Sequence, residues 1–152
     1  MMIKDSQKDI CVLGLDPGET TGVCVMKGHE LLHTEQLDTK NYNNSAKSFN
    51  LLIKHWGINQ IACEDYRVYA WESDKHKWAN LHTPKLIGLI LGVAWFNFVD
   101  VSLRMAIDAK QFVTDDKLEQ WGLWQKGQRH ARDAIRHAIY NQIFGSGAGK
   151  SR

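Results

Sequence analysis

The chain has 152 residues, of which 43% are hydrophobic and 10% aromatic, and its 19 Lys and Arg against 17 Asp and Glu give a formal charge of +2. This length is typical of one domain and excludes a large two-domain enzyme with an interdomain cleft. The hydrophobic content and six tryptophans exclude a disordered chain. The mildly basic charge argues neither for nor against a nucleic-acid partner.

The three cysteines, Cys11, Cys24 and Cys63, lie in apolar stretches and form no Cys-x-x-Cys pair. This usage predicts buried free thiols in a reducing cytoplasm. Residues 1–9 contain no apolar segment that could act as a signal peptide, and no apolar run approaches the roughly 20 residues that span a bilayer. We therefore expect a cytoplasmic protein with no membrane association and a flexible N-terminus over 1–9.

Hydrophobic patterning predicts one α/β domain over residues 10–144, followed by a flexible basic tail over 145–152. Short apolar runs bounded by turn residues predict strands at 10–15, 22–26, 31–37, 58–63 and 100–106. Apolar residues at helical spacing predict helices at 46–56, 83–97, 110–121 and 128–144. The strand–helix–strand step into the fourth strand predicts that this strand runs parallel to an earlier one.

Two acidic residues stand where predicted core strands end. Asp16 follows the apolar run 10–15, and Glu64 follows the apolar residues 61–63. If these strands are parallel neighbours, the two carboxylates repel each other, and one retains its proton unless a cation is bound. Carboxylate oxygens of this kind suit Mg²⁺ or Mn²⁺. The alternative is the commoner role of such an acid, as a turn or capping residue.

A third acid stands alone in a basic segment. Asp133 is the only Asp or Glu in residues 121–152, which contain six Lys and Arg. On the helix predicted there, His130, Asp133 and His137 share one face. If that face packs over the strand ends, His130 and Asp133 join the two strand-end acids in the layout of a two-metal phosphodiesterase. The alternative is that His130 and Asp133 lie on a solvated helix surface.

Three motifs together resemble those of the RuvC-like Holliday junction resolvases of the ribonuclease H-like superfamily, and most of all the phage-type members. The motifs are VLGLDPGETTG at 12–22, IACED at 61–65 and HARDA at 130–134. They occur in this order with fitting elements between them. The resemblance implies a ribonuclease H-like fold, with a five-stranded mixed sheet flanked by helices on both faces.

The resemblance also implies a site and a reaction. It makes Asp16, Glu64, His130 and Asp133 the catalytic metal ligands, holding two Mg²⁺ or Mn²⁺ ions per active site. The implied reaction is hydrolysis of DNA phosphodiesters that leaves 5′-phosphate and 3′-hydroxyl ends. The implied substrate is a four-way junction or other branched DNA, nicked symmetrically by a homodimer. Asp65 has no fixed role in the family pattern and is either a further metal contact or a loop acid.

Candidate DNA contacts follow the second motif. The predicted loop over 66–82 mixes aromatic residues that can stack on bases with cations that can meet phosphates. We expect DNA contacts from Tyr66, Arg67, Tyr69, Lys75 and Lys77. The alternative is that the aromatic residues only pin the loop to the domain. Family members with strict sequence preference carry an aromatic just after the fourth-strand acid; because the arrangement differs here, no cleavage preference is inferred.

Further phosphate contacts are expected at Lys110, Lys117, Arg129 and Arg132, with solvated surface as the alternative for each. The helix over 83–98 is apolar nearly all round, and its Gly88 and Gly92 would let a second helix approach closely. This favours a homodimer through that helix. Burial within one subunit is the alternative.

Parts of the sequence are also compatible with two other functions. The segment DPGETTG at 16–22 also resembles the first phosphate-binding hairpin of actin-like phosphotransferases and ATPases, but those proteins close two such domains over a nucleotide. A non-catalytic binder of branched DNA would gain nothing from acids that face phosphate. Hydrolysis of RNA–DNA hybrids stays open. The glycine-rich tail lacks P-loop spacing, because Phe144 stands where the first glycine is required, so we expect no nucleotide cofactor.

Overall fold

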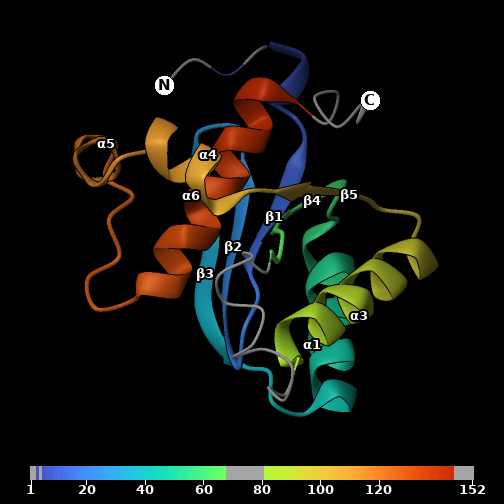
Figure 1. Cartoon of the computed structure of the whole chain (residues 1–152). Coiled ribbons are helices and arrows are strands. Elements are labelled where there is room, and N and C mark those ends of the chain that lie inside the picture. Colours follow the sequence, from blue (N-terminus) through green and yellow to red (C-terminus); the bar gives the residue numbers. More distant parts are fainter. Residues whose placement is uncertain (1–2, 4, 68–80, 146–152) are drawn as a thin grey trace.

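The computed structural model of the chain describes residues 3, 5–67 and 81–145 (Figure 1). Its centre is a five-stranded sheet in the order β3-β2-β1-β4-β5. The strands are β1 (Cys11–Asp16), β2 (Thr20–Lys27), β3 (Glu30–Asp38), β4 (Gln60–Glu64) and β5 (Asp100–Arg104). The first three strands are antiparallel, whereas β4 pairs in parallel with both β1 and β5. The predicted mixed sheet and parallel fourth strand are therefore confirmed.

Helices cover both faces of the sheet (Figure 1). α1 (Tyr42–Trp56) and α3 (His82–Phe96) lie on one face, while α4 (Ala106–Phe112), α5 (Asp115–Gln120) and α6 (Arg129–Phe144) lie on the other. The alternation of side chains along β1 divides the core between these layers. Leu13 and Leu15 pack with the buried residues of α1 and α3, and Val12 packs with those of α6.

Two glycines let α6 lie directly against the sheet. A Cβ atom at Gly22 of β2 would overlap the backbone carbonyl of His130. A Cβ atom at Gly14 of β1 would overlap the carbonyl of Ala134 and lie 2.7 Å from Cys24 Sγ. Any residue other than glycine at these positions would push the helix away. The close contact sets the height of α6 above the ends of β1 and β4.

The structure differs from the sequence prediction between residues 110 and 121. A single helix was expected there, but α4 ends at Phe112 and α5 begins at Asp115. Thr114 is the N-cap of α5, and its side chain accepts a hydrogen bond from the backbone N–H of Lys117. This capping replaces the hydrogen bonds of a continuous helix and turns the chain.

Two predicted bounds also shift: α1 begins at Tyr42 instead of 46, because Asn41 caps it, and β5 ends at Arg104 instead of 106. All three cysteines are buried free thiols, as expected. Within the predicted N-terminal extension, Ile3 is buried and Asp5–Gln7 forms a short 3-10 helix. No helix in the described part of the chain has the length and hydrophobicity to cross a membrane.

Candidate active site

The acids singled out in the sequence meet where β1 and β4 end. Asp16 is the last residue of β1, and Glu64 is the last residue of β4. These strands are parallel neighbours with Leu15 paired to Cys63, so both acids reach the same edge of the sheet. α6 crosses this edge and brings in Asp133, which is buried. The charges of Glu64 and Asp133 both act on Asp16, which shows that the three carboxylates form one electrostatic cluster.

Asp16 is the acid of this cluster whose pKa is raised. Burial raises the pKa of its carboxyl to about 6, and the negative charge of Glu64 adds to the effect. His130 opposes this increase, because its Nδ1 lies 2.7 Å from Asp16 Oδ2. The first turn of α6 therefore supplies a direct partner for the first-strand acid. This hydrogen bond makes His130 part of the acid cluster.

Glu64 has a different partner. Burial by itself would raise the pKa of Glu64, but the hydrogen bond and charge of His137 outweigh it, and the pKa is lowered below its usual value. His137 is fully buried in α6, and its Nε2 lies 3.0 Å from Glu64 Oε2. Glu64 is therefore held ionised while Asp16 is pushed toward its protonated form. Two neighbouring carboxylates with opposite pKa shifts are typical of a functional site.

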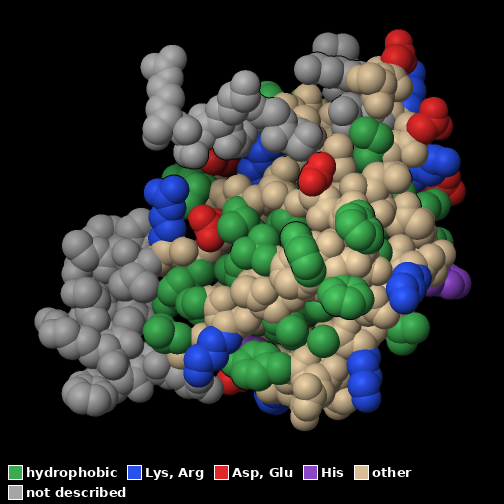
Figure 2. All heavy atoms as spheres, turned by 90° about the vertical axis from the view of Figure 1, so that its right-hand side faces the viewer, with side chains coloured by type: hydrophobic (Ala, Val, Ile, Leu, Met, Phe, Trp, Pro, Cys, Tyr) green, Lys and Arg blue, Asp and Glu red, His purple; other side chains and the backbone are tan. Residues whose placement is uncertain are grey.

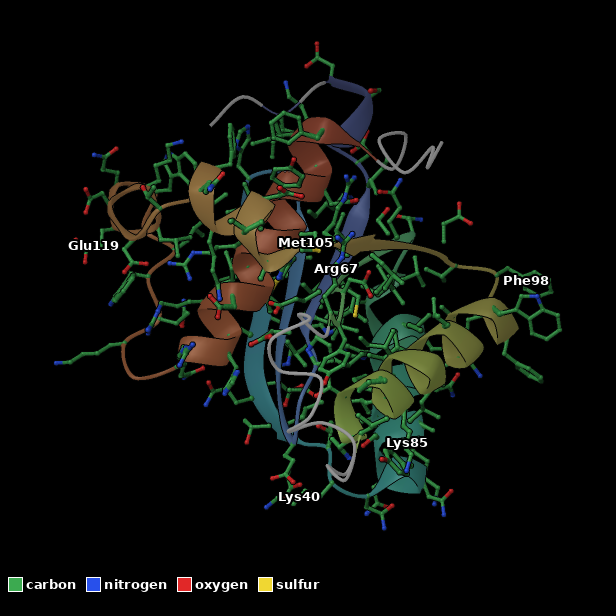
Figure 3. All side chains as sticks on the ribbon, viewed as in Figure 1. Lys40, Arg67, Lys85, Phe98, Met105 and Glu119 are labelled. Carbon is green, nitrogen blue, oxygen red and sulfur yellow. The ribbon has the colours of Figure 1, made fainter. Side chains whose placement is uncertain are left out.

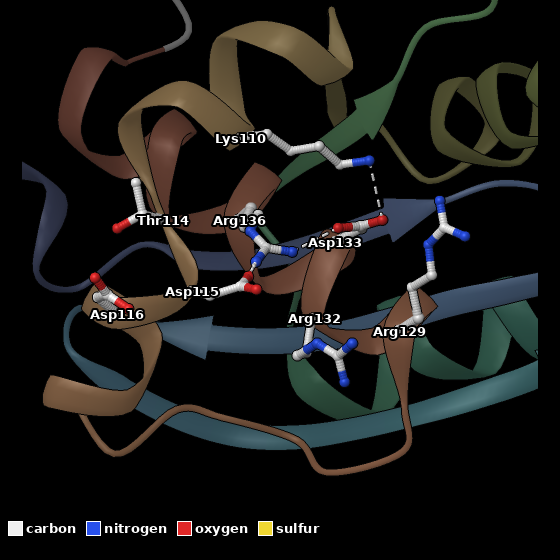
Figure 4. Close-up of a pocket in the computed structure, with 8 residues that line it drawn as sticks. All are labelled: Lys110, Thr114, Asp115, Asp116, Arg129, Arg132, Asp133 and Arg136. Atoms are coloured by element: carbon white, nitrogen blue, oxygen red, sulfur yellow. Dashed lines mark hydrogen bonds and ion pairs between the residues drawn. The ribbon is translucent and has the colours of Figure 1, made fainter.

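Asp133 is neutralised by two cations (Figure 4). Arg136 Nη1 donates to Asp133 Oδ1 at 2.6 Å, and Lys110 Nζ lies 3.2 Å from Asp133 Oδ2. The buried guanidinium of Arg136 also donates to the carbonyl of Val113 at 2.9 Å and to Asp115. Arg136 thus ties Asp133 to the turn between α4 and α5.

The donor chemistry fits a hard divalent cation, although no ready-made cage is present. Among the described residues, no group of three or more His, Cys, Asp or Glu is arranged to hold a metal ion. Three carboxylates whose charges act on one another, one of them with a raised pKa, are nevertheless the kind of ligands that Mg²⁺ or Mn²⁺ would stabilise. Because Lys110 lies on Asp133 Oδ2, a metal ion at that oxygen would have to displace the ammonium group.

Two cavities border the acids. A cavity of about 520 Å³ adjoins Asp133, with Lys110, Arg129 and Arg132 among its lining residues (Figure 4). Arg132 is fixed there, because its guanidinium lies 4.2 Å from the centre of the Trp124 ring and it donates to the Gln125 carbonyl at 2.7 Å. The predicted phosphate contacts Lys110, Arg129 and Arg132 are therefore brought together beside Asp133.

A second cavity, of about 230 Å³, adjoins Glu64. Its lining includes Glu64, Tyr66 and Arg67 from the end of β4, together with Met105 from the end of β5. Arg67 and Met105 are labelled in Figure 3 near the end of the sheet. Two of the predicted DNA contacts, Tyr66 and Arg67, thus lie next to the fourth-strand acid.

The structure gives two other candidates local roles. Lys117 Nζ donates to the carbonyl of Phe112 at 2.6 Å and lies over the ring of the same residue, so it stabilises the end of α4. Asp65 accepts a hydrogen bond from the backbone N–H of Tyr66 at 2.9 Å, as a turn residue does. The remaining predicted contacts, Tyr69, Lys75 and Lys77, lie outside the described residues.

The sequence carries no sign that Arg136 and His137 contact the acids; Arg136 was expected only as a phosphate contact or a solvated cation. His137 was placed on the correct helix face, but a histidine among aliphatic residues gives no sequence signal that distinguishes a core residue from a partner of Glu64. Arg136 belongs to the run of basic residues on α6 and looked like a solvated cation. Its burial became visible only once the α4–α5 turn was known to pack against it.

Comparison with known proteins gives a consistent result at the level of fold. No protein-family model matches the sequence, and no curated protein matches it. Thermus thermophilus RuvC in complex with a Holliday junction substrate matches with a TM-score of 0.71 at 18% identity, over 89% of this chain and 94% of that chain. The yeast mitochondrial Holliday junction resolvase Ydc2 matches with a TM-score of 0.60 at 12% identity, over 90% and 80%.

A viral protein gives a third match. The fowlpox virus resolvase, in complex with Holliday junction DNA, matches with a TM-score of 0.52 at 14% identity, over 88% of this chain and 97% of that chain. The three proteins come from a bacterium, a mitochondrion and a virus, and each matches over most of its length. The resemblance carried by the sequence motifs is thus confirmed: this chain has the fold of the RuvC-like Holliday junction resolvases.

Proposed function

We propose that the protein is a metal-dependent endonuclease that nicks four-way junctions and other branched DNA. The observation that carries the proposal is the cluster of Asp16, Glu64 and Asp133 at the ends of two parallel strands, on the fold of the junction resolvases. In a protein that only bound DNA, three carboxylates at this place would lower the affinity for DNA, because they repel phosphate. The cluster therefore favours catalysis over simple binding.

In the proposed hydrolysis of a phosphodiester, some residues of the site would bind metal and others would contact the phosphate. Two Mg²⁺ or Mn²⁺ ions, when bound, would activate a water molecule and stabilise the leaving 3′ oxygen. Asp16, Glu64 and Asp133 would hold them, with His130 orienting Asp16 through its bond to Oδ2 or serving as a further ligand. Lys110, once released from Asp133, would be free to contact a phosphate bound beside this acid.

The path proposed for the DNA strand follows the two cavities that border the acids. Lys110, Arg129 and Arg132 line the cavity on the α6 side, and Tyr66 and Arg67 line the cavity on the β4 side. Cations in these positions would contact phosphates and fix the strand without reading its sequence. Recognition in this form selects the shape of the DNA, which agrees with the choice of a branched substrate.

We also propose that the protein acts as a homodimer through α3. One side of this helix is buried in the subunit, but Gly88, Leu91, Gly92 and Trp95 form an exposed stripe at helical spacing. A Cβ atom at either glycine would meet nothing within 4 Å, so a second helix can approach the backbone closely. Figure 2 shows hydrophobic side chains gathered on this side of the molecule.

The experiment that tests the function compares substrates and metals. Labelled four-way junction, linear duplex and RNA–DNA hybrid are incubated with the protein in Mg²⁺, Mn²⁺ or EDTA. We expect paired, symmetrical nicks in the junction with either metal, and none in EDTA. Equal cutting of linear duplex or of the hybrid would contradict junction selectivity. Binding of the junction without cutting in either metal would show a non-catalytic binder.

A further inference from the structure

A buried histidine outside the predicted ligand set contacts the acid of β4. His137 lies in the middle of α6 with a side chain that is 1% exposed, and its Nε2 is 3.0 Å from Glu64 Oε2. An ionised carboxylate offers only acceptors, so Nε2 must carry the hydrogen and donate it. The other ring nitrogen, Nδ1, is buried and has no partner within the described structure. The bond to Glu64 is therefore the one polar contact of the ring among the described residues.

Packing alone does not account for a histidine at this place. Of the buried positions of α6 around it, those at 134, 135, 138 and 139 are filled by small or aliphatic residues, while the polar Asp133, Arg136 and Asn141 each have a side-chain hydrogen-bond partner. An aliphatic residue would fill the space of His137 without leaving a buried ring nitrogen unsatisfied, which is unfavourable. The contact with Glu64 supplies the reason for the imidazole.

Glu64 is the acid of the cluster that most needs such a partner. Its side chain has one more rotatable bond than that of Asp16 or Asp133, and it is 24% exposed against 12% and 5%. The freedom of a longer and more open side chain is lost when it is fixed in one rotamer. A rigid donor in the core of α6 fixes the position of Oε2 before any cation arrives.

We propose that His137 is a positioning residue that holds Glu64 ready for divalent metal. This inference rests on the proposed function, because it concerns the same site. Each acid then has its own donor on α6: Asp16 is held by His130, Glu64 by His137 and Asp133 by Arg136. The partners of Glu64 and Asp133 are buried and adjacent in sequence, so a single helical turn fixes two of the three acids.

The test uses four variants of the full chain. His137→Leu removes the donor but fills a similar volume, and His137→Met is a more adaptable apolar replacement in case the leucine variant does not fold. His137→Gln keeps an N–H donor close to the position of Nε2. Gln142→Leu is the matched control, because Gln142 is another buried polar residue of α6 whose side-chain atoms have no partner among the described residues. Folding of each variant is checked by urea unfolding in EDTA.

Two measurements follow: Mn²⁺ binding by calorimetry in the absence of DNA, and single-turnover nicking of a junction as Mn²⁺ is increased. We expect His137→Leu or His137→Met to weaken Mn²⁺ binding by about 10- to 100-fold. The nicking curve should shift to higher Mn²⁺ by a similar factor. His137→Gln should recover most of the affinity, and Gln142→Leu should bind Mn²⁺ as the wild type does.

A double variant separates positioning from packing. In a Glu64→Gln background, which lacks the carboxylate, His137→Leu should have no further effect on Mn²⁺ binding. Wild-type Mn²⁺ affinity in a folded His137→Leu variant would overturn the positioning role and leave the proposed function intact. A wild-type protein that binds no Mn²⁺ and cuts no junction would overturn the proposed function itself.

Discussion

At the scale of single residues, the candidate site is a set of acids whose negative charges repel one another. The pKa of Asp16 is raised to about 6 by burial and by Glu64, whereas the pKa of Glu64 is lowered by His137. At neutral pH, the folded chain without metal is therefore destabilised by the ionised Asp16, which is buried and lies near the negative charge of Glu64. Such a cost is typical of residues that serve function rather than stability.

The sign of this effect gives a prediction for Asp16→Asn. Because the folded-state pKa of Asp16 is raised from 3.8 to about 6, its contribution to stability is full below about pH 4 and is lost as the pH rises through about 6. In EDTA, the variant should be more stable than the wild type near pH 7 by up to about 3 kcal/mol, and the difference should vanish near pH 4. Urea unfolding of both proteins across this pH range measures it. A pH-independent difference would show that Asp16 is not strained.

The acids themselves could be predicted from the sequence, but their partners could not. An acid at the end of an apolar run is visible in one dimension, and so is the single acid of a basic segment. Arg136 and His137 differ from surface or core residues only through contacts with Val113 and Glu64, which are distant in sequence. Only the packing of α6 against β4 and the α4–α5 turn reveals their roles.

At the scale of elements, α6 is the part that assembles the site. It rests on Gly14 and Gly22 and carries a partner for each of the three acids. The break between α4 and α5 contributes as well. In one straight helix, residues five apart point roughly 140° away from each other, yet Lys110 and Asp115 both reach the Asp133–Arg136 pair. Periodicity over 110–121 predicted a helix but could not reveal that Thr114 caps a second one.

The contact between β2 and α6 predicts the effect of Gly22→Ala. The added methyl group would overlap the carbonyl of His130, so the first turn of α6 must shift and His130 must move away from Asp16. We expect a loss of stability on the order of 1–3 kcal/mol and a larger relative loss of junction nicking. Gly18→Ala is the control, since its Cβ would lie 3.3 Å from the Thr20 carbonyl and would not touch α6. Urea unfolding measures the stability of both variants, and a nicking assay measures their activity. Unchanged nicking activity in Gly22→Ala would show that α6 does not depend on the contact between Gly22 and the His130 carbonyl.

At the scale of the whole molecule, two features lie on opposite sides of the sheet. The acids lie at the strand ends beside α6, while the exposed apolar stripe lies on α3 on the other face of the sheet (Figure 1). In the proposed dimer, the α3 stripes pack together and each subunit contributes one active site. Paired nicks in a junction require two such sites held at a fixed spacing. The sequence predicted that α3 is apolar nearly all round, but it could not show which side of the helix packs in the core and which side is exposed.

The dimer proposal predicts the effect of Trp95→Glu. Trp95 is 77% exposed in the isolated chain, so the change should leave the fold intact and place a charge in the interface. Sedimentation should show a dimer for the wild type and a monomer for the variant, and the variant should lose symmetrical paired nicking. Leu51→Glu is the control, because Leu51 is also an exposed hydrophobic residue but lies on α1, outside the proposed α3 interface. A monomeric wild type, or a variant that stays dimeric, would contradict the interface.

The most direct test of the central claim separates junction binding from junction cutting. Binding of a four-way junction is measured in EDTA, and single-turnover nicking is measured in Mg²⁺, for the wild type, Asp16→Asn and Glu64→Gln. We expect both variants to bind the junction at least as tightly as the wild type, because each loses a negative charge near phosphate, and we expect neither to cut it. Cutting by either variant at the wild-type rate, or cutting by the wild type in EDTA, would contradict the claim that these strand-end acids form a metal-dependent nuclease site.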